Sequence, residues 1–182
     1  MPYSPLDLVT PEVRARAARV RLVCFDVDGT LTDGRLYFDT AGNEAKAFHV
    51  QDGQGLNLLR RFGFGVHMIT ARASKAAEKR GADLGIEVHI GIKDKLALVR
   101  ALCEEHGLAL EQVAFVGDDL PDLDCLRAAG LSVAPANAHP WIAEIVHWRT
   151  LARGGKGAAR EVCDLLLAAQ GHVEEILRKR AP

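Results

Sequence analysis

The sequence predicts an α/β fold, a doubly wound parallel sheet with helices on both faces. Strand-like runs alternate with helical stretches of about 10–15 residues, which is typical of parallel sheets. The first such run, residues 20–27 (VRLVCFDV), is almost entirely apolar, as expected for a strand buried on both faces. With 182 residues, of which 48% are hydrophobic, the chain fits one ordinary domain, and we expect a single domain over residues 1–182.

The first half of the chain contains the predicted hairpin. Residues 1–19 form a helical lead-in that is broken by Pro2, Pro5 and Pro11. After the first strand, segments 34–38 and 45–50 flank the turn 39–43, which predicts a β-hairpin of about 15 residues. This insertion after the first strand is too short for a large cap domain.

The later elements follow from periodicity and from capping residues. A helix is expected from about Gln54 to Arg61, a strand over 65–70, and then a helix over 73–85 with Ser74 as its N-cap. Strands are expected at 87–91, 113–118 and 131–136, and helices at 93–107, 120–130, from 139 onwards, and 158–170. Gly107 ends the helix that precedes it.

Composition excludes several classes of function. The formal net charge is −1, so no basic excess indicates binding to nucleic acid or to an anionic membrane surface. No apolar run approaches the ~20 residues that membrane insertion requires, and the N-terminus has no signal-peptide pattern, so we expect a cytoplasmic protein. The four cysteines form no C-x-x-C pair, which indicates buried thiols rather than a zinc site or a disulfide framework.

Polar residues gather where the predicted strands end. Asp26 and Asp28 end the first strand, Thr70 ends the second, Asp118 and Asp119 end the fourth, and Lys95 begins the helix after the third. In open parallel sheets, ligands bind at the carboxyl ends of strands near the topological switch point. We therefore expect these side chains to meet at one edge of the sheet.

This combination predicts Mg²⁺ and phosphoryl chemistry. Asp26 and Asp118 are the expected side-chain ligands of Mg²⁺, and a backbone carbonyl near Asp28 is a further ligand. Thr70, Lys95 and the backbone N–H groups of the turn after Asp28 are expected to bind a phosphoryl group. Asp26 is the expected nucleophile, and Asp28 is the expected proton donor to the leaving oxygen and later activates water.

The motifs resemble those of the haloacid dehalogenase superfamily. FDVDGT, the threonine of ITAR, Lys95 and GDDLPD occur in the order of that family's four motifs. Further segments (KAFHVQDGQG, LSVAPANAHP and GGKGAAREVCDLLLAAQG) resemble its phosphatases of 3-deoxy-D-manno-octulosonate 8-phosphate, from about residue 20 to 172.

The resemblance implies a Mg²⁺-dependent phosphatase of a small sugar-acid phosphate in lipopolysaccharide precursor synthesis, and a homotetramer. It also implies that His49, Val50, Gln51, Asp52, Gly53, Arg72 and Arg80 bind substrate. Asp119 and Asp122 are expected to support the ligands. The sequence departs from the family pattern at Ala71, His49 and Asn57.

Two segments are expected to complete neighbouring active sites in the oligomer. The hairpin, about residues 34–50, is too short for a lid, so hairpins of several subunits are expected to pair. Within the basic tail, about 149–182, residues 149–160 (RTLARGGKGAAR) are expected to be mobile, and Arg153, Lys156 and Arg160 are hypothesised to hold a substrate carboxylate in an adjacent site. Truncation after Thr150 is expected to leave the fold intact.

Other functions stay open at this point. A related nine-carbon sugar-acid phosphate is an alternative substrate. A phospho-accepting receiver domain would also combine acidic residues, a threonine and a lysine, but its acceptor aspartate would lie on a later strand, where the runs 65–70 and 87–91 carry none. An inactive homologue is disfavoured because all five polar residues that the chemistry needs are present, namely Asp26, Asp28, Thr70, Lys95 and Asp118. A calcium loop at residues 26–33 is disfavoured because a strand precedes it and its glycine is fourth, not sixth.

Overall fold

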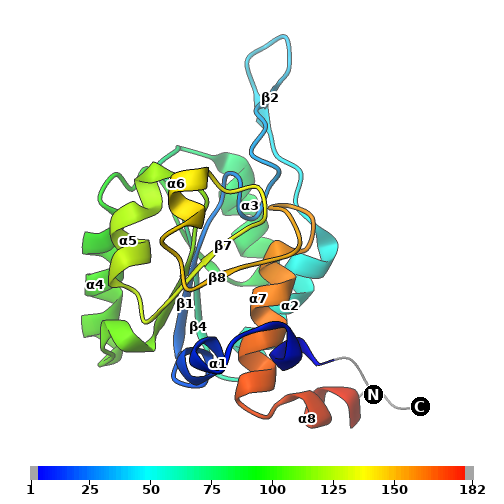
Figure 1. The fold of residues 1–182 in the computed structure, drawn as a ribbon. Helices are drawn as coiled ribbons and strands as arrows, with labels where there is room; N and C mark the ends of the chain where they lie inside the picture. Colours follow the sequence, from blue (N-terminus) through cyan, green and yellow to red (C-terminus); the bar gives the residue numbers. More distant parts are fainter. Residues whose placement is uncertain (1–3, 179–182) are drawn as a thin grey trace.

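A computed structural model describes residues 4–178 of the chain. Within these residues, a six-stranded parallel sheet has the order β5-β4-β1-β6-β7-β8 and carries helices on both faces (Figure 1). The strands are β1 (Leu22–Asp26), β4 (Gly65–Ile69), β5 (Glu87–His89), β6 (Val113–Val116), β7 (Leu131–Ala134) and β8 (Trp148–Arg149). The predicted doubly wound α/β fold is confirmed.

The switch point of the sheet lies between β1 and β6. From β1 the chain builds β4 and β5 on one side, then returns to place β6, β7 and β8 on the other. At the carboxyl ends, Asp26 of β1 pairs with Ile69 of β4, and Phe25 pairs with Val116 of β6, so these three strands end together. The carboxyl ends of β1 and β6 therefore flank the position where ligands bind in such sheets.

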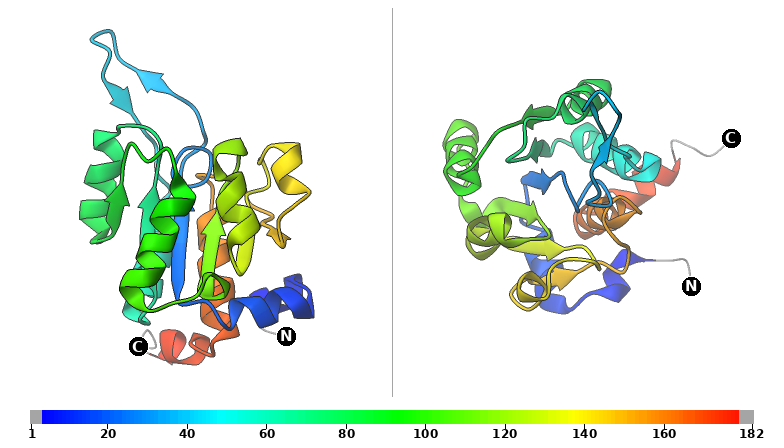
Figure 2. Two further views of the ribbon diagram at one scale, coloured as in Figure 1. Left: turned by 90° about the vertical axis from the view of Figure 1, so that its left-hand side faces the viewer. Right: turned by 90° about the horizontal axis from the view of Figure 1, so that it is seen from above.

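Helices cover both faces of the sheet, as the two further views show (Figure 2). One face packs against α1 (Pro11–Ala17), α2 (Val50–Arg61), α3 (Lys75–Leu84) and α7 (Ala158–Ala169). The other packs against α4 (Lys95–His106), α5 (Leu123–Ala128) and α6 (Pro140–Ala143).

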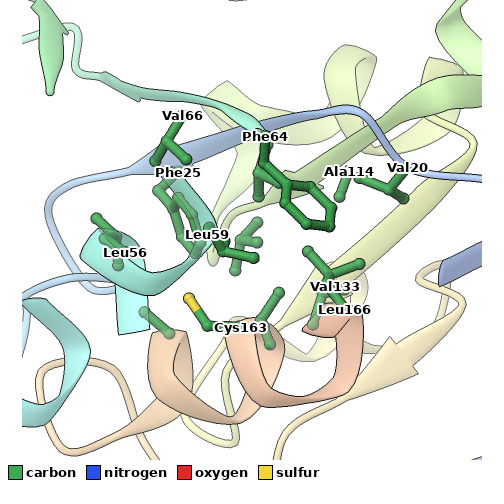
Figure 3. Close-up of a cluster of buried hydrophobic side chains, with 14 of the residues drawn as sticks. Val20, Phe25, Leu56, Leu59, Phe64, Val66, Ala114, Val133, Cys163 and Leu166 are labelled. Carbon is green, nitrogen blue, oxygen red and sulfur yellow. The ribbon is translucent and has the colours of Figure 1, made fainter. Parts of the chain in front are cut away.

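Strand β1 contributes side chains to both hydrophobic clusters. Val23 and Phe25 point into the cluster with α2 and α7, and Leu22 and Cys24 point into the other. All four side chains are fully buried. In the larger cluster, Phe25 lies among side chains from α2 and α7 (Figure 3). Alternating burial on two faces explains why this strand is apolar at nearly every position.

Capping residues set the helix ends as predicted. The Ser74 hydroxyl accepts a hydrogen bond from the Ala77 N–H at 3.3 Å, at the start of α3. Gly107 follows α4 in the left-handed conformation, with φ of +64°. Both positions match the cap signals in the sequence.

The hairpin is shorter, and α2 longer, than expected. The strands β2 (Tyr37–Phe38) and β3 (Glu44–Ala45) have two residues each, and α2 begins at Val50 instead of Gln54. The Gly53 N–H already donates to the His49 carbonyl, because Asp52 binds backbone groups of α7 and draws this segment into a helix. Residues 46–49 are therefore neither strand nor helix.

Smaller elements were not predicted. They are the 3-10 turn η2 (Leu110–Gln112), the edge strand β8, and α8 (Val173–Arg178). The 3-10 turns η1 (Pro5–Leu8) and η3 (Leu120–Asp122) fall in segments that were predicted to be helical. Pro2 and the last four positions of the tail lie outside the described residues. None of the helices within residues 4–178 combines the length and apolar character needed to cross a membrane.

The prediction of mobility for residues 149–160 is wrong, whereas the helix predicted over 158–170 is confirmed as α7. Helix α7 belongs to the core, since Val162, Cys163 and Leu166 are fully buried against α2 and the sheet. The loop before it packs on its own chain, and the Gly155 N–H donates to the Thr30 carbonyl at 3.1 Å. Truncation after Thr150 would remove this part of the core, so it would not leave the fold intact.

Candidate active site

Eight predicted polar residues line one cavity at the carboxyl ends of β1, β4 and β6. The cavity has a volume of about 320 Å³. The predicted residues in its wall are Asp26, Asp28, Thr70, Arg72, Lys95, Asp118, Asp119 and Asp122. The structure therefore brings together residues from four separate segments, as the strand ends predicted.

Lys95 binds two buried carboxylates. Its ammonium donates to Asp26 at 2.5 Å and to Asp122 at 2.6 Å. Burial raises the pKa of Asp26 well above its ordinary value, and the charge on Asp122 adds to this. Burial alone would lower the pKa of Lys95, but the two carboxylates hold it above its ordinary value. Lys95 is thus a fixed positive charge beside Asp26.

Asp118 faces the turn that follows β1. The Thr30 hydroxyl donates to its carboxylate at 3.4 Å. Burial raises the pKa of Asp118 to about 7, and the charges on Asp122 and Asp119 contribute. Gly29 has φ of +91°, and a Cβ added there would lie 2.0 Å from Asp118 Oδ2. Only glycine allows the turn to approach this carboxylate so closely.

Asp122 supports the site through backbone contacts. Its carboxylate accepts hydrogen bonds from the Asp118 N–H at 3.0 Å and the Asp119 N–H at 3.4 Å. A Cβ on Gly117 would lie 2.5 Å from the Asp122 carboxyl carbon, so this contact also depends on a glycine. The Asp119 side chain caps the Leu120 N–H at 2.8 Å. The Asp122 contacts therefore hold the segment that follows β6, while Asp119 caps the start of η3.

The donors fit a hard divalent cation. Carboxylate oxygens of Asp26, Asp118 and Asp122 lie within 4.8 Å of one another. Oxygen ligands on rigid strand ends suit Mg²⁺. Burial first, and then the charges on Asp122 and Asp119, raise the pKa of Asp118, and a bound cation would stabilise these carboxylate charges. Both carboxylate oxygens of Asp122 accept hydrogen bonds, Oδ1 from Lys95 and Oδ2 from two backbone N–H groups. Lys95 bonds only Oδ1 of Asp26, so Asp26 and Asp118 are the available side-chain ligands.

Asp28 has partners that differ from those of Asp26. Its carboxylate pairs with the Lys46 ammonium and accepts from the Thr70 hydroxyl at 3.3 Å. Thr70 in turn accepts from the Arg72 N–H at 3.1 Å. The carboxylate of Asp28 is therefore directed toward Thr70 and the hairpin, away from the cluster formed by Asp26, Asp118 and Asp122.

Two hairpin residues at the site were missed by sequence reasoning. The Lys46 side chain is 1% exposed and also pairs with Glu44 at 2.9 Å. Glu44 pairs with Arg72 at 2.5 Å and accepts from the Ser74 hydroxyl at 3.3 Å. A chain of alternating charges thus connects Asp28 to the base of the hairpin. The only signal in the sequence was the alternation of charged residues in the second hairpin arm.

The glycine-rich loop 150–157 packs against the turn that follows β1. Asn137 accepts from the Gly154 N–H at 2.6 Å and donates to the Gly29 carbonyl at 3.4 Å. A Cβ on Gly154 would lie 1.7 Å from that carbonyl oxygen. Loop 150–157 thus supports the turn of its own chain, which differs from the predicted role in a neighbouring site.

The other predicted substrate-binding residues lie apart from this cavity within the chain. His49, Asp52, Gly53 and Arg80 line a second, nearly filled cavity of about 10 Å³ that shares no residue with the first. Arg80 lies 2.1 Å from the position of a Cβ on Gly53 and over the Phe48 ring. Its guanidinium also donates to the His49 carbonyl at 3.5 Å.

Predicted substrate-binding residues at the starts of α2 and α7 bind other groups of the same chain. Asp52 accepts from the Gly157 N–H at 3.3 Å and the Arg160 N–H at 2.8 Å, so it satisfies the start of α7. The Arg160 guanidinium pairs with Asp164 at 2.7 Å. Val50 and Gln51 are exposed at the start of α2, and Lys156 is exposed in the glycine loop. Their part in substrate binding stays a prediction.

Comparisons with known proteins agree with this geometry. The family model of the haloacid dehalogenase-like hydrolases matches residues 79–161. The chain is 46% identical over 175 residues to the 3-deoxy-D-manno-octulosonate 8-phosphate phosphatase of Salmonella typhimurium, and the match covers 95% of this chain and 91% of the relative.

Solved structures have the same fold. A hypothetical protein from Xanthomonas campestris has a TM-score of 0.98 and 66% identity over the whole of both chains. The 3-deoxy-D-manno-octulosonate 8-phosphate phosphatase of Moraxella catarrhalis, solved with a magnesium ion, a phosphate ion and KDO, has a TM-score of 0.91 and 37% identity. That match covers 93% of this chain and 98% of the other.

Proposed function

The chain belongs to the haloacid dehalogenase-like hydrolases, and we propose that it is a Mg²⁺-dependent phosphatase of 3-deoxy-D-manno-octulosonate 8-phosphate. The products are the free eight-carbon sugar acid and inorganic phosphate, a step in lipopolysaccharide precursor synthesis. The observation that carries the proposal is the convergence of Asp26, Asp28, Thr70, Lys95 and Asp118 on one cavity. The phosphatase relatives supply the substrate class.

Asp26 and Asp118 would hold Mg²⁺, together with the backbone carbonyl of Asp28. When bound, this ion neutralises the charge of the phosphoryl oxygens. Lys95 adds a fixed positive charge, and Thr70 adds a hydroxyl donor, at the same cavity. These groups offset the repulsion between a phosphate dianion and the five aspartates that line the cavity.

Asp26 attacks phosphorus in the first step. A bond forms between its carboxylate oxygen and phosphorus, and the bond between phosphorus and the sugar oxygen breaks. Asp28 gives its proton to that leaving oxygen. Water then attacks the aspartyl-phosphate, Asp28 takes a proton from the water, and Asp26 and phosphate are released. The separate partners of Asp26 and Asp28 suit these separate roles.

The chain is proposed to act as a homotetramer in which hairpins complete neighbouring sites. The hairpin exposes Leu36, Tyr37 and Phe38, with exposed fractions of 48%, 42% and 59%. An isolated two-stranded hairpin is marginal in water and leaves unpaired strand edges. Paired hairpins from other subunits would cover these side chains and shield the cavity. A cytoplasmic location is also proposed, since all four cysteines are free, buried thiols.

A panel of substrates tests the proposal. Phosphate release is measured with 3-deoxy-D-manno-octulosonate 8-phosphate, with a related nine-carbon sugar-acid phosphate, and with a hexose phosphate that has no carboxylate. We expect kcat/KM to be at least about tenfold higher for the eight-carbon substrate, because one or two well-placed contacts are worth that ratio. EDTA should stop release, and added Mg²⁺ should restore it. An equal or higher kcat/KM on the nine-carbon substrate would change the assignment.

A further inference from the structure

A second group of potential metal ligands lies away from the carboxylate cavity, on β4 and the edge strand β5. His67 of β4 pairs in register with Glu87 of β5, and His89 follows Glu87 by two residues. The three side chains therefore project from the same face of the sheet. None of them lines the cavity that holds Asp26.

The three ligand atoms converge on one point. His67 Nδ1 lies 3.1 Å from His89 Nε2 and 3.5 Å from Glu87 Oε2, and His89 Nε2 lies 3.9 Å from Glu87 Oε2. In a tetrahedral zinc site, with bonds of about 2.0–2.2 Å, neighbouring ligand atoms lie roughly 3.3 Å apart. The carboxylate is close to both nitrogens but is too far for a good hydrogen bond to either.

We propose that His67, Glu87 and His89 form a binding site for a divalent transition metal ion of the zinc type. Two imidazoles and one carboxylate are ligands that such ions prefer, whereas Mg²⁺ prefers oxygen. The site is thus chemically distinct from the aspartate cluster.

The surroundings suit a metal site with an open position. His67, Glu87, Glu105 and His106 line a cleft of about 680 Å³, so two of the three ligands, His67 and Glu87, can be reached from solvent through it. His106, from α4, lies with its ring 6.1 Å from that of His67. Burial lowers the pKa of His67, and the neighbouring His89 adds to this.

Titration of the full chain with Zn²⁺ in excess Mg²⁺ tests the site. The side chain of Glu87 is 73% exposed and that of His89 is 22% exposed. We therefore expect Glu87→Gln and His89→Gln to fold like the wild type. We expect each change to weaken one Zn²⁺-binding step at least about tenfold and to remove most of the Zn²⁺-induced rise in Tm. Zn²⁺ that enters the aspartate cluster should be unaffected by either variant.

Two controls define the outcome. Glu105→Gln removes a charge from the same cleft without removing a ligand, and it should keep wild-type Zn²⁺ affinity. Phosphate release with Mg²⁺ should be unchanged in all three variants, which reports an intact fold. The assignment is overturned if Zn²⁺ affinity and the Tm shift are the same in wild type, Glu87→Gln and His89→Gln. The short His67–His89 contact would then be only a hydrogen bond between rings.

Discussion

Asp26 and Asp28 are two residues apart, yet their carboxylates have different partners. Asp26 contacts Lys95 and lies beside Asp118 and Asp122, whereas Asp28 contacts Thr70 and Lys46. The turn at Gly29 allows this separation. The surroundings of Asp26 suit its proposed role as nucleophile and metal ligand, and those of Asp28 suit its proposed role as proton carrier.

The Asp28→Asn variant should lose most turnover. An amide cannot transfer the proton, so we expect kcat to fall roughly 10²–10⁴-fold while KM changes little. Steady-state phosphate release measures this. A kcat close to that of the wild type would remove the acid–base role of Asp28.

The Lys46→Met variant tests the unexpected contact at the hairpin base. Without the ammonium, Asp28 loses its cationic partner beside the substrate phosphate, whereas Glu44 keeps its pair with Arg72. Charged hydrogen bonds are worth about 1.5–3 kcal/mol, so we expect kcat/KM to fall at least about tenfold. Lys79→Met is the matched control, since Lys79 pairs with Asp83 at the surface. Equal effects of the two changes would show that Lys46 has no part in the site.

At this scale, the sequence predicted residues at strand ends well and hairpin residues poorly. Asp26, Thr70 and Asp118 could be placed because parallel strands end at one edge of the sheet. Lys46 could not be placed, because its position depends on how the hairpin folds back over the cavity. The role of Asp52 was missed for the same reason, since its partners lie on α7, more than one hundred residues later.

Among the elements, the turn after β1 depends most strongly on its neighbours. It is in contact with Asp118 from the end of β6 and with the glycine loop before α7. Positive φ at Gly29 and close approach at Gly154 are separate requirements for glycine. Together they hold the backbone N–H groups that are proposed to bind phosphate.

Gly29→Ala should displace Asp118 and lower both Mg²⁺ affinity and kcat. Gly42→Ala is the matched control, because Gly42 has a similar φ of +82° but nothing within 4 Å of an added Cβ. Both variants carry the strain of a left-handed residue, about 1–2 kcal/mol. Only Gly29→Ala should lose activity, and this is measured from the Mg²⁺ dependence of phosphate release. Similar activity losses in both would mean that strain alone explains the effect.

Element boundaries were predicted best where a local signal fixes them. Ser74 begins α3 through a hydrogen bond of its own side chain, and Gly107 ends α4 through its left-handed backbone conformation. The start of α2 was placed four residues late, because a tertiary contact of Asp52 extends the helix. Strand β8 was missed because two residues give no detectable period.

Within residues 4–178, the hairpin strands β2 and β3 pair only with each other, and the hairpin contacts the rest of the molecule at its base through Glu44 and Lys46. Figure 1 shows the hairpin standing clear of the sheet and helices, above the end of the sheet where the cavity lies. Its aromatic side chains Tyr37 and Phe38 are exposed. An exposed apolar hairpin beside an open cavity is the feature on which the proposed tetramer depends.

Replacing Phe38 by serine should lower the assembly state. Multi-angle light scattering should give four chains for the wild type and fewer for Phe38→Ser, with a parallel loss of kcat/KM. Trp141→Ser is the control, since Trp141 is 65% exposed on α6, away from the hairpin. A monomeric wild type with full activity would contradict the proposed shared site.

The parallel sheet was predicted from patterning, whereas assembly depends on surfaces that patterning does not define. Buried strands such as β1 are apolar throughout, and that is visible in one sequence. Loop 150–157 was expected to reach a neighbour but packs on its own chain, because its glycines permit backbone contact. The basic, glycine-rich composition of this loop is compatible both with reaching a neighbouring subunit and with packing on its own chain, so composition could not predict which occurs.

The most direct test is the kcat of the Asp26→Asn variant on 3-deoxy-D-manno-octulosonate 8-phosphate with saturating Mg²⁺. The amide is a poor nucleophile toward phosphorus, so the account predicts no phosphate release above that of buffer with Mg²⁺. Circular dichroism should show an unchanged fold. A kcat within about tenfold of the wild type would contradict nucleophilic catalysis by Asp26.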